Sequence, residues 1–235
     1  MPGTCGARPE TRGARPETRG ARPETCGTRH WPPRNLVLRT PRLELRPDDD
    51  AGLDELVEVA YRGVHPPAEM PFLSPWTDAD PRYLGRGVLQ YFWSERARYA
   101  PESWTLHFLV RHEGRVIGVQ SLGGANFAVL REVDTGSWLG LAHQRQGFGT
   151  EMRAAVLAYA FDHLGARHAR SAVLDGNVAS ATVSERLGYR PDGVAQVAPR
   201  GVPVVEHRLR LTPDTFRRPA WELVVDGHTP EIAFL

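Results

Sequence analysis

The chain has 235 residues, of which 41% are hydrophobic and 24% charged, the composition of a soluble globular protein with one large domain or two small ones. Its 29 basic and 28 acidic residues leave a formal net charge of +1, so no overall field attracts nucleic acid or an anionic membrane. No apolar run approaches the roughly 18 residues of a membrane span, and the N-terminus lacks the apolar core of a secretory signal. We therefore expect a cytoplasmic protein that makes no contact with membranes or nucleic acid.

The first 32 residues are dominated by a seven-residue repeat, "TCGARPE TRGARPE TRGARPE", which begins at Thr4. One alanine per unit provides no apolar seam to offset the roughly 1–2 kcal/mol per residue that ordering the backbone costs. We expect residues 1–32 to form a disordered low-complexity segment, and we favour a coding expansion or a misplaced start codon over an arginine-bearing binding arm. Cys5 and Cys26 both lie in this segment, so residues 33–235 hold no thiol for a disulfide, a metal or nucleophilic catalysis.

Alternating strand and helix patterns begin after residue 33. "RLELRP" (42–47) has the period of two of a strand, and "DDDAGLDELVEVAYRG" (48–63) predicts a helix with Asp50 as its N-cap and Gly63 at its end. The segment "VHPPAEMPFLSPW" (64–76) carries four prolines among apolar residues, so we expect a loop that is only partly exposed to solvent.

The middle and end of the chain continue the alternation. We expect a helix over 81–99, a hairpin over 104–122 that turns at Glu113 and Gly114, and a strand over 133–141. A helix over 149–165, a strand over 169–174 and a helix after Asn177 follow. "HRLRL" (207–211) predicts a final edge strand, which completes a domain over 33–212. The apolar tail 213–235 is expected to pack on this domain or on a second subunit, which leaves a homo-oligomer open.

The stretch "HQRQGFGTEM" (143–152) lies between the strand over 133–141 and the next helix. Its glycines make backbone N–H groups accessible where the helix begins, and such N–H groups bind anions, above all phosphate. A plain strand-to-helix turn is the alternative. No Gly-Lys-Ser/Thr follows and no third glycine is present, so the stretch is neither a Walker loop nor a dinucleotide fingerprint.

Within this stretch, the six residues from Gln144 to Gly149 match the pattern Gln/Arg-x-x-Gly-x-Gly/Ala of the GNAT N-acyltransferase superfamily. Together with "TPRLELRP" (40–47) and "NVASATVSERLGYRPDG" (177–193), they resemble its Rim-like branch. "GVHPPAEMPFLSPWT", "GVQSL" and "TGSWLGLAHQ" are similar to members that use succinyl-CoA. Arg145 departs from the glycine that the family often has there, and it either crowds the loop or reaches a coenzyme phosphate.

The resemblance implies an α/β fold, a strongly bent mixed sheet of six or seven strands with helices on both faces, splayed between its fourth and fifth strands. These would be the strands over 133–141 and 169–174, with coenzyme A in the splay and the pantetheine arm bonded to the backbone of Leu139 and Leu141. Asn177 would bind the pantetheine amides, or cap the following helix, or do both. The loop residues assigned to coenzyme A are Gln144, Arg145, Gln146, Gly147, Phe148, Gly149 and Thr150.

The implied function is the transfer of an acetyl or succinyl group from acyl-CoA to a primary amine by direct attack in a ternary complex. The base would be Asp134, or Glu132 acting through a water, and Ser180 would donate a hydrogen bond to the leaving thiolate. His65, Trp76 and Gln120 are the candidate substrate residues. Acyl-CoA is a co-substrate, so we expect no permanently bound cofactor and no metal site.

The acceptor is left open among a small molecule, a lysine and a protein N-terminus. The alternative function is a catalytically weak acyl-CoA sensor or a partner-binding module. Such a protein would bind coenzyme A and leave every amine unmodified.

Overall fold

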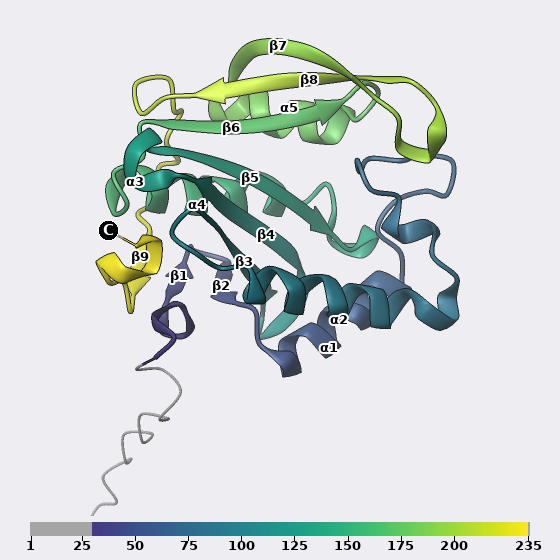
Figure 1. Cartoon of the computed structure of the whole chain (residues 1–235), viewed down its shortest axis with the longest axis horizontal. Helices are drawn as coiled ribbons and strands as arrows, with labels where there is room; N and C mark the ends of the chain where they lie inside the picture. Colours follow the sequence, from purple (N-terminus) through teal and green to yellow (C-terminus); the bar gives the residue numbers. More distant parts are fainter. Residues whose placement is uncertain (1–29, 235) are drawn as a thin grey trace, which may run out of the picture.

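The computed structural model describes residues 30–234, and it consists of one large mixed sheet with helices on both faces (Figure 1). No helix in that part of the chain is long and apolar enough to cross a membrane. The expected segment 1–32 lies almost entirely outside the described residues, as do Cys5 and Cys26.

The sheet has nine strands in the order β7-β8-β6-β5-β4-β3-β2-β1-β9, two or three more than expected. All neighbours are antiparallel except β5 and β6, which are parallel. The strands are β1 (Val37–Arg39), β2 (Leu43–Pro47), β3 (Ser103–His112), β4 (Arg115–Ala125), β5 (Glu132–Leu139), β6 (His168–Leu174), β7 (Arg190–Val197), β8 (Val204–Leu211) and β9 (Val224–Asp226).

β5 and β6 diverge soon after they begin. Only Glu132, Val133 and Asp134 of β5 pair with β6, opposite residues 168–170, although β5 continues to Leu139 and β6 to Leu174. Figure 1 shows β6, β8 and β7 separating from the rest of the sheet beyond this point. The splay expected between the strands over 133–141 and 169–174 is therefore present, and it leaves the facing edges of β5 and β6 without a strand partner.

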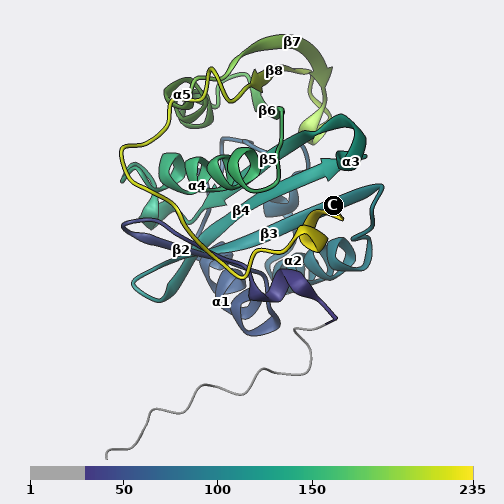
Figure 2. The ribbon, with the colours of Figure 1, turned by 90° about the vertical axis from the view of Figure 1, so that its left-hand side faces the viewer.

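The helices cover the sheet in two layers (Figure 2). α1 and α2 form an apolar cluster with one face of β3, β4 and β5, whereas α4 packs in the main core against the other face and α5 borders it. The helices are α1 (Asp50–Tyr61), α2 (Pro81–Ala97), the single turn α3 (Phe127–Leu130), α4 (Phe148–Asp162) and α5 (Val178–Leu187).

The N-cap of α1 is Asp49 and not Asp50 as the sequence predicted. The Oδ1 of Asp49 accepts a hydrogen bond of 2.7 Å from the N–H of Gly52, which satisfies one of the unpaired amides of the first turn. Asp50 is the first helical residue, and its carboxylate instead pairs with Arg96 of α2. Three aspartates in succession made the choice ambiguous, because each is a good N-cap.

The tight turn between β3 and β4 is the one that the sequence predicted. Glu113 and Gly114 both have positive φ, 51° and 80°, as a two-residue hairpin turn requires. α2 ends at Ala97, two residues before the expected end, and the loop over 64–76 has no α-helix, in agreement with its prolines.

The C-terminal region differs from the prediction at one strand. β8, which contains "HRLRL", is not an edge strand, because β7 pairs with its outer side. The tail returns to the opposite end of the sheet, where β9 adds to β1 and the side chain of Ile232 is fully buried. The hydroxyl of Tyr99 donates a hydrogen bond to the Ile232 carbonyl and fastens this end of the chain.

Candidate active site

The loop before α4 presents unpaired amides at the place where β5 and β6 diverge. Arg145 and Gly147 adopt left-handed backbone conformations with φ of 59° and 84°, and Gly147 is the N-cap of α4. The N–H groups of residues 145–149 have no hydrogen-bond partner among residues 30–234. Free amides together with the positive end of a 15-residue helix make this loop suited to binding a phosphate.

An ion pair between the buried Glu151 and the exposed Arg42 fixes this loop against β2. Glu151, in the first turn of α4, is only 7% exposed and accepts hydrogen bonds from the Thr40 hydroxyl at 2.6 Å and the Nε of Arg42 at 2.7 Å. The Nη1 of Arg42 donates to the carbonyl of Gln146 at 3.0 Å, and its guanidinium lies over the ring of Phe148. Thr40 and Arg42, which immediately precede β2 in the segment "TPRLELRP", therefore support the loop directly.

Most side chains of the loop hold it in place. The Nε2 of Gln144 donates to the carbonyls of Val64 and Leu139 at 2.7 and 2.9 Å, and that of Gln146 donates to Ala142. Phe148 is buried, so its side chain belongs to the core. The side chain of Arg145 is exposed and forms no ion pair with a residue of the described part, which leaves the guanidinium available to an anion.

Two of the backbone groups expected to bind pantetheine already have partners. The carbonyl of Leu139 accepts from Gln144, and the N–H of Leu141 donates to the carbonyl of Gly63 at 3.0 Å. The assignment of Leu139 and Leu141 to pantetheine stays a prediction.

Asn177 and Ser180 stand at the start of α5, beside the splay. The Oδ1 of Asn177 accepts from the N–H of Ser180 at 3.1 Å, so Asn177 caps α5. The hydroxyl of Ser180 has no hydrogen-bond partner within residues 30–234 and is half-buried. The amide nitrogen of Asn177 and this hydroxyl are the groups that α5 offers to a ligand.

A buried cation that the sequence interpretation missed lies under the same splay. Arg153 of α4 is 5% exposed, and its Nη1 and Nη2 donate to the hydroxyls of Ser184 on α5 and Ser137 on β5 at 3.0 and 3.3 Å. Its Nε has no partner, and no described carboxylate forms an ion pair with it. Burial lowers the pKa of Arg153. The signal was a charged residue inside the otherwise apolar run "RAAVLAYAF".

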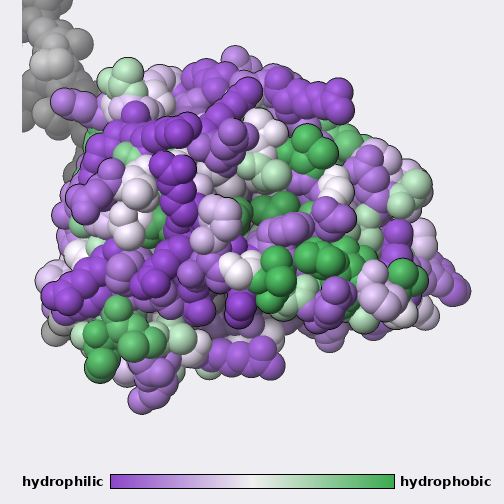
Figure 3. Space-filling model, turned by 90° about the horizontal axis from the view of Figure 1, so that it is seen from above, coloured by the Kyte–Doolittle hydropathy of each residue, from purple (hydrophilic) through white to green (hydrophobic). Residues whose placement is uncertain are grey.

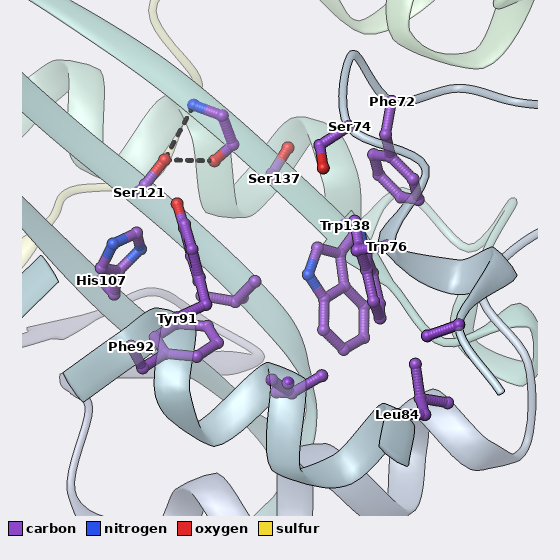
Figure 4. Close-up of a pocket in the computed structure, with 15 residues that line it drawn as sticks. Phe72, Ser74, Trp76, Leu84, Tyr91, Phe92, His107, Ser121, Ser137 and Trp138 are labelled. Atoms are coloured by element: carbon purple, nitrogen blue, oxygen red, sulfur yellow. Dashed lines mark hydrogen bonds between the residues drawn. The ribbon is translucent and has the colours of Figure 1, made fainter. Parts of the chain in front are cut away.

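On the opposite face of the sheet, a cavity of about 530 Å³ lies between α2, the loop over 64–78 and strands β3 to β5 (Figure 4). Trp76 of the loop and Trp138 of β5 pack together with ring centroids 5.4 Å apart, and Phe72 packs on Trp76 at the same distance. The polar lining consists of Ser74, His107, Ser121, Ser137 and the hydroxyl of Tyr91. Ser137 therefore borders this cavity and also contacts Arg153.

Acidic groups lie at the end of the cavity near His107. The carboxylate of Glu95 is 3.9 Å from the Nε2 of His107, and this interaction lowers the pKa of Glu95. Asp134 lies on the cavity side of β5, and although much of its surface is exposed, desolvation raises its pKa; Arg170 and His107 oppose this rise and Glu132 adds to it. The charges of Glu95 and Asp134 also contribute to the raised pKa of Tyr91, which results first from desolvation. A carboxylate whose pKa is raised is a better proton acceptor than an ordinary surface aspartate.

Of the three predicted substrate residues, the structure places one in the wall of the cavity and two outside it. Trp76 lines the cavity. His65 does not, because its two ring nitrogens contact the carbonyl of Pro66 and the hydroxyl of Thr77. Gln120 is fully buried on the α4 side of β4, where its Nε2 donates to the carbonyl of Gly136. Glu132, the second candidate base, forms an ion pair of 2.9 Å with Arg170.

The loop over 64–78 is attached to the β7–β8 connection. Arg200 donates from Nε and Nη2 to the two carboxylate oxygens of Asp78, each at 2.6 Å, and also contacts the carbonyl of Pro67. Figure 1 shows the loop over 64–78 beside the β7–β8 connection, although the two segments are far apart in the sequence. Within residues 30–234 no group of three or more His, Cys, Asp or Glu side chains could hold a metal ion.

Comparison with known proteins identifies this arrangement. Residues 42–190 match the model of the acetyltransferase (GNAT) domain. RimJ from Mycobacterium smegmatis in complex with CoA-disulfide is 19% identical, with a TM-score of 0.64 over 81% of this chain and 92% of that one. RimL, a ribosomal L7/L12 alpha-N-protein acetyltransferase in complex with coenzyme A, is 16% identical, with a TM-score of 0.60 over 76% of this chain and 99% of that one. A GCN5-related N-acetyltransferase from Brucella melitensis is 18% identical, with a TM-score of 0.58 over 76% and 79%. Because the family model matches more than half of the residues of this chain, the chain belongs to the GNAT family of acetyltransferases.

Proposed function

We propose that the protein transfers an acetyl or succinyl group from acyl-CoA to a primary amine by direct attack in a ternary complex. The observation that carries this proposal is the set of unpartnered amides at residues 145–149, which lies at the start of α4 beside the splay of β5 and β6. The amides bind the coenzyme pyrophosphate, and the open edge of β5 receives the pantetheine arm as an added strand would be received.

The chemistry needs no covalent intermediate, because a thioester is already an activated acyl donor. The amine nitrogen attacks the thioester carbonyl from the side of the cavity, the carbon–sulfur bond breaks, and the thiolate leaves. Asp134 accepts the proton of the amine, and its raised pKa suits it to this role. Ser180 donates a hydrogen bond to the sulfur, since its hydroxyl is free and lies on the first turn of α5.

The identity of the donor depends on what lies beyond the thioester. A succinyl group carries a second carboxylate that needs a cation or hydrogen-bond donors, whereas an acetyl group needs only an apolar wall. His65 and Gln120 are both engaged elsewhere, but Arg153 is a buried cation without a carboxylate partner and reaches Ser137 at the cavity wall. Arg153 therefore supports succinyl-CoA as an accepted donor.

The test follows free thiol from acetyl-CoA and from succinyl-CoA with a disulfide dye, in the presence of amines and of peptide N-termini. Mass spectrometry of the same samples identifies the acylated product. We expect amine-dependent thiol release with matching product mass, and a loss of about a hundredfold in kcat/KM for Asp134→Asn.

Two results separate the competing functions. If coenzyme A binds but no amine accelerates thiol release above hydrolysis, the protein is an acyl-CoA sensor and the transferase proposal is wrong. Failure to bind coenzyme A at all would overturn both functions.

A further inference from the structure

The wall of the cavity is mainly apolar, and its two ends differ in character. One end is built by Trp76, Trp138, Phe72 and Leu84, and the other by His107 and Tyr91 with Glu95 and Asp134 close by (Figure 4). A volume of about 530 Å³ falls in the range of pockets that enclose a small organic molecule. Apolar residues also gather at the surface in the half of the molecule that carries the loop over 64–78, as seen from above (Figure 3).

The polar end has the charge that an amine requires. Glu95 and Asp134 are both carboxylates, and the imidazole of His107 and the hydroxyl of Tyr91 interact with both of them. Glu95 also pairs with the exposed Arg98 at 3.3 Å, so Asp134 contributes the carboxylate that no ion pair engages within residues 30–234. The Nε2 of His107 is buried and has no hydrogen-bond partner in the described part of the chain. An ammonium ion is attracted to this end, and it can lose its proton there before it attacks.

The apolar end is unsuited to a peptide. The N–H and C=O groups of a polypeptide N-terminus need hydrogen-bond partners when they are buried, and burying them without partners is costly. Trp76 and Trp138 offer ring faces and their two indole N–H groups, and Leu84 offers a methyl surface, so Ser74 carries the one side-chain oxygen at this end that can accept from peptide N–H groups. An aromatic or aliphatic body packs well against such a wall.

We propose that the acceptor is a small amphipathic amine, with the amine at the end formed by His107 and Asp134 and an apolar body between Trp76, Trp138 and Leu84. The inference rests on the proposed function, because it names the substrate class of the same site. It excludes a polypeptide N-terminus and a polar amine as the preferred acceptor.

Gly87 allows the cavity to be filled without disturbing the fold. It lies on α2 on the same face as Leu84 and Tyr91, it lines the cavity, and a Cβ added there meets no atom within 4 Å. In Gly87→Phe the new ring occupies the cavity, whereas Gly87→Ala adds one methyl group with a similar effect on the backbone. The alanine variant is therefore the matched control.

The experiment is isothermal titration calorimetry on the full chain saturated with coenzyme A, which cannot acylate the amine. Phenethylamine is the amphipathic probe, phenethyl alcohol is its uncharged analogue, ethanolamine is the polar amine, and a hexapeptide with a free serine N-terminus represents a polypeptide. We expect phenethylamine to bind about tenfold or more tightly than each of the other three. Gly87→Phe should weaken phenethylamine binding by about tenfold, and Gly87→Ala, which adds only one methyl group, should weaken it less.

Tighter binding of ethanolamine or of the hexapeptide would overturn the acceptor class, as would unchanged phenethylamine binding in Gly87→Phe when the variant melts at the wild-type temperature. Thiol release from acetyl-CoA separates this failure from that of the proposed function. If phenethylamine binds as expected and is never acylated, the acceptor site stands and the transferase activity fails. If only the peptide is acylated, the transferase activity stands and the acceptor class is wrong.

Discussion

The Nη1 of Arg153 in α4 donates a hydrogen bond of 3.0 Å to the hydroxyl of Ser184 in α5, and so joins the two helices beneath the splay of β5 and β6. A buried guanidinium is costly unless an anion accompanies it, and no carboxylate of residues 30–234 pairs with this one. The two serine hydroxyls only partly satisfy it, because the Nε remains unbonded. The site therefore favours a ligand that brings a negative charge.

The first prediction concerns donor selectivity. Arg153→Met keeps an unbranched side chain, shorter than that of arginine, and removes the charge, so kcat/KM for succinyl-CoA should fall by about tenfold or more relative to acetyl-CoA. The melting temperature should stay the same or rise, because an apolar side chain replaces an uncompensated buried charge. Arg153→Lys keeps the positive charge and is the control. An unchanged ratio of the two donors in Arg153→Met would show that Arg153 does not contact the acyl group.

The second prediction concerns pH. Asp134 must be ionised to accept a proton, and desolvation raises its pKa, so kcat/KM should fall as the pH drops through a value above the ordinary range for aspartate. Asp134→Asn should abolish this acid limb together with most of the activity. The free energy of unfolding of Asp134→Asn should not fall below that of the wild type at neutral pH, because a carboxyl with a raised pKa opposes folding once it ionises.

Glu132→Gln is the matched control for this substitution. Glu132 is two residues away on β5 and pairs with Arg170, so its loss should leave the acid limb present but move it to a lower pH, because the charge of Glu132 helps to raise the pKa of Asp134. If the limb disappears in Glu132→Gln and persists in Asp134→Asn, the base has been assigned to the wrong carboxylate.

The third prediction concerns the attachment of the C-terminal tail. The hydroxyl of Tyr159 in α4 bonds to the Nδ1 of His228 at 3.0 Å, and the ring of His163 lies 5.4 Å from that of His228. Burial, and then the neighbouring charge of His163, lower the pKa of His228, whereas Glu231 opposes them. The stabilisation is therefore complete above the ordinary histidine pKa of about 6.5 and is lost as the pH falls through the lower folded value.

Calorimetric melting between about pH 7 and pH 5 measures this effect, because few carboxylates titrate in that window. The melting temperature of the wild type should decrease across it, and His228→Asn should reduce the decrease. An equal pH dependence in the two proteins would mean that the bond between Tyr159 and His228 does not help to hold the tail.

The sequence predicted the elements whose patterns were periodic and missed those that were short or exposed. The hairpin of β3 and β4 and the helix α4 were recovered because their apolar positions repeat over many residues. β1 and β9 have three residues each, too few for any period. β7, "RPDGVAQV", is largely exposed and has proline and aspartate at its second and third positions, so nothing in its composition indicates a strand.

The candidate site could likewise be predicted from the sequence only in part. The loop over 144–149 was recognisable because its glycines and its place between a strand and a helix are local features. The aromatic cavity depends on α2, β3 and the loop over 64–78 meeting in space, so neither His107 nor Glu95 could be assigned from the chain alone. Gln120 was predicted to meet substrate, but which face of β4 is turned to the cavity follows from the sheet register, where Val119 and Ser121 line it.

The proposed binding of acyl-CoA by the amides of residues 145–149 underlies every other step of the mechanism, and a substitution of Gly149 tests it most directly. A Cβ at Gly149 would lie 3.7 Å from Val183 and 4.0 Å from Leu139, ordinary contacts, so Gly149→Ala should fold normally, and Gly149→Val adds bulk beside the amides. Gly147 is less suitable, because its φ of 84° makes any side chain strained. Calorimetric titration with coenzyme A should show a dissociation constant about tenfold or more higher for Gly149→Val, a smaller change for Gly149→Ala, and melting temperatures close to that of the wild type. Wild-type affinity in Gly149→Val would contradict the assignment of the coenzyme to this loop.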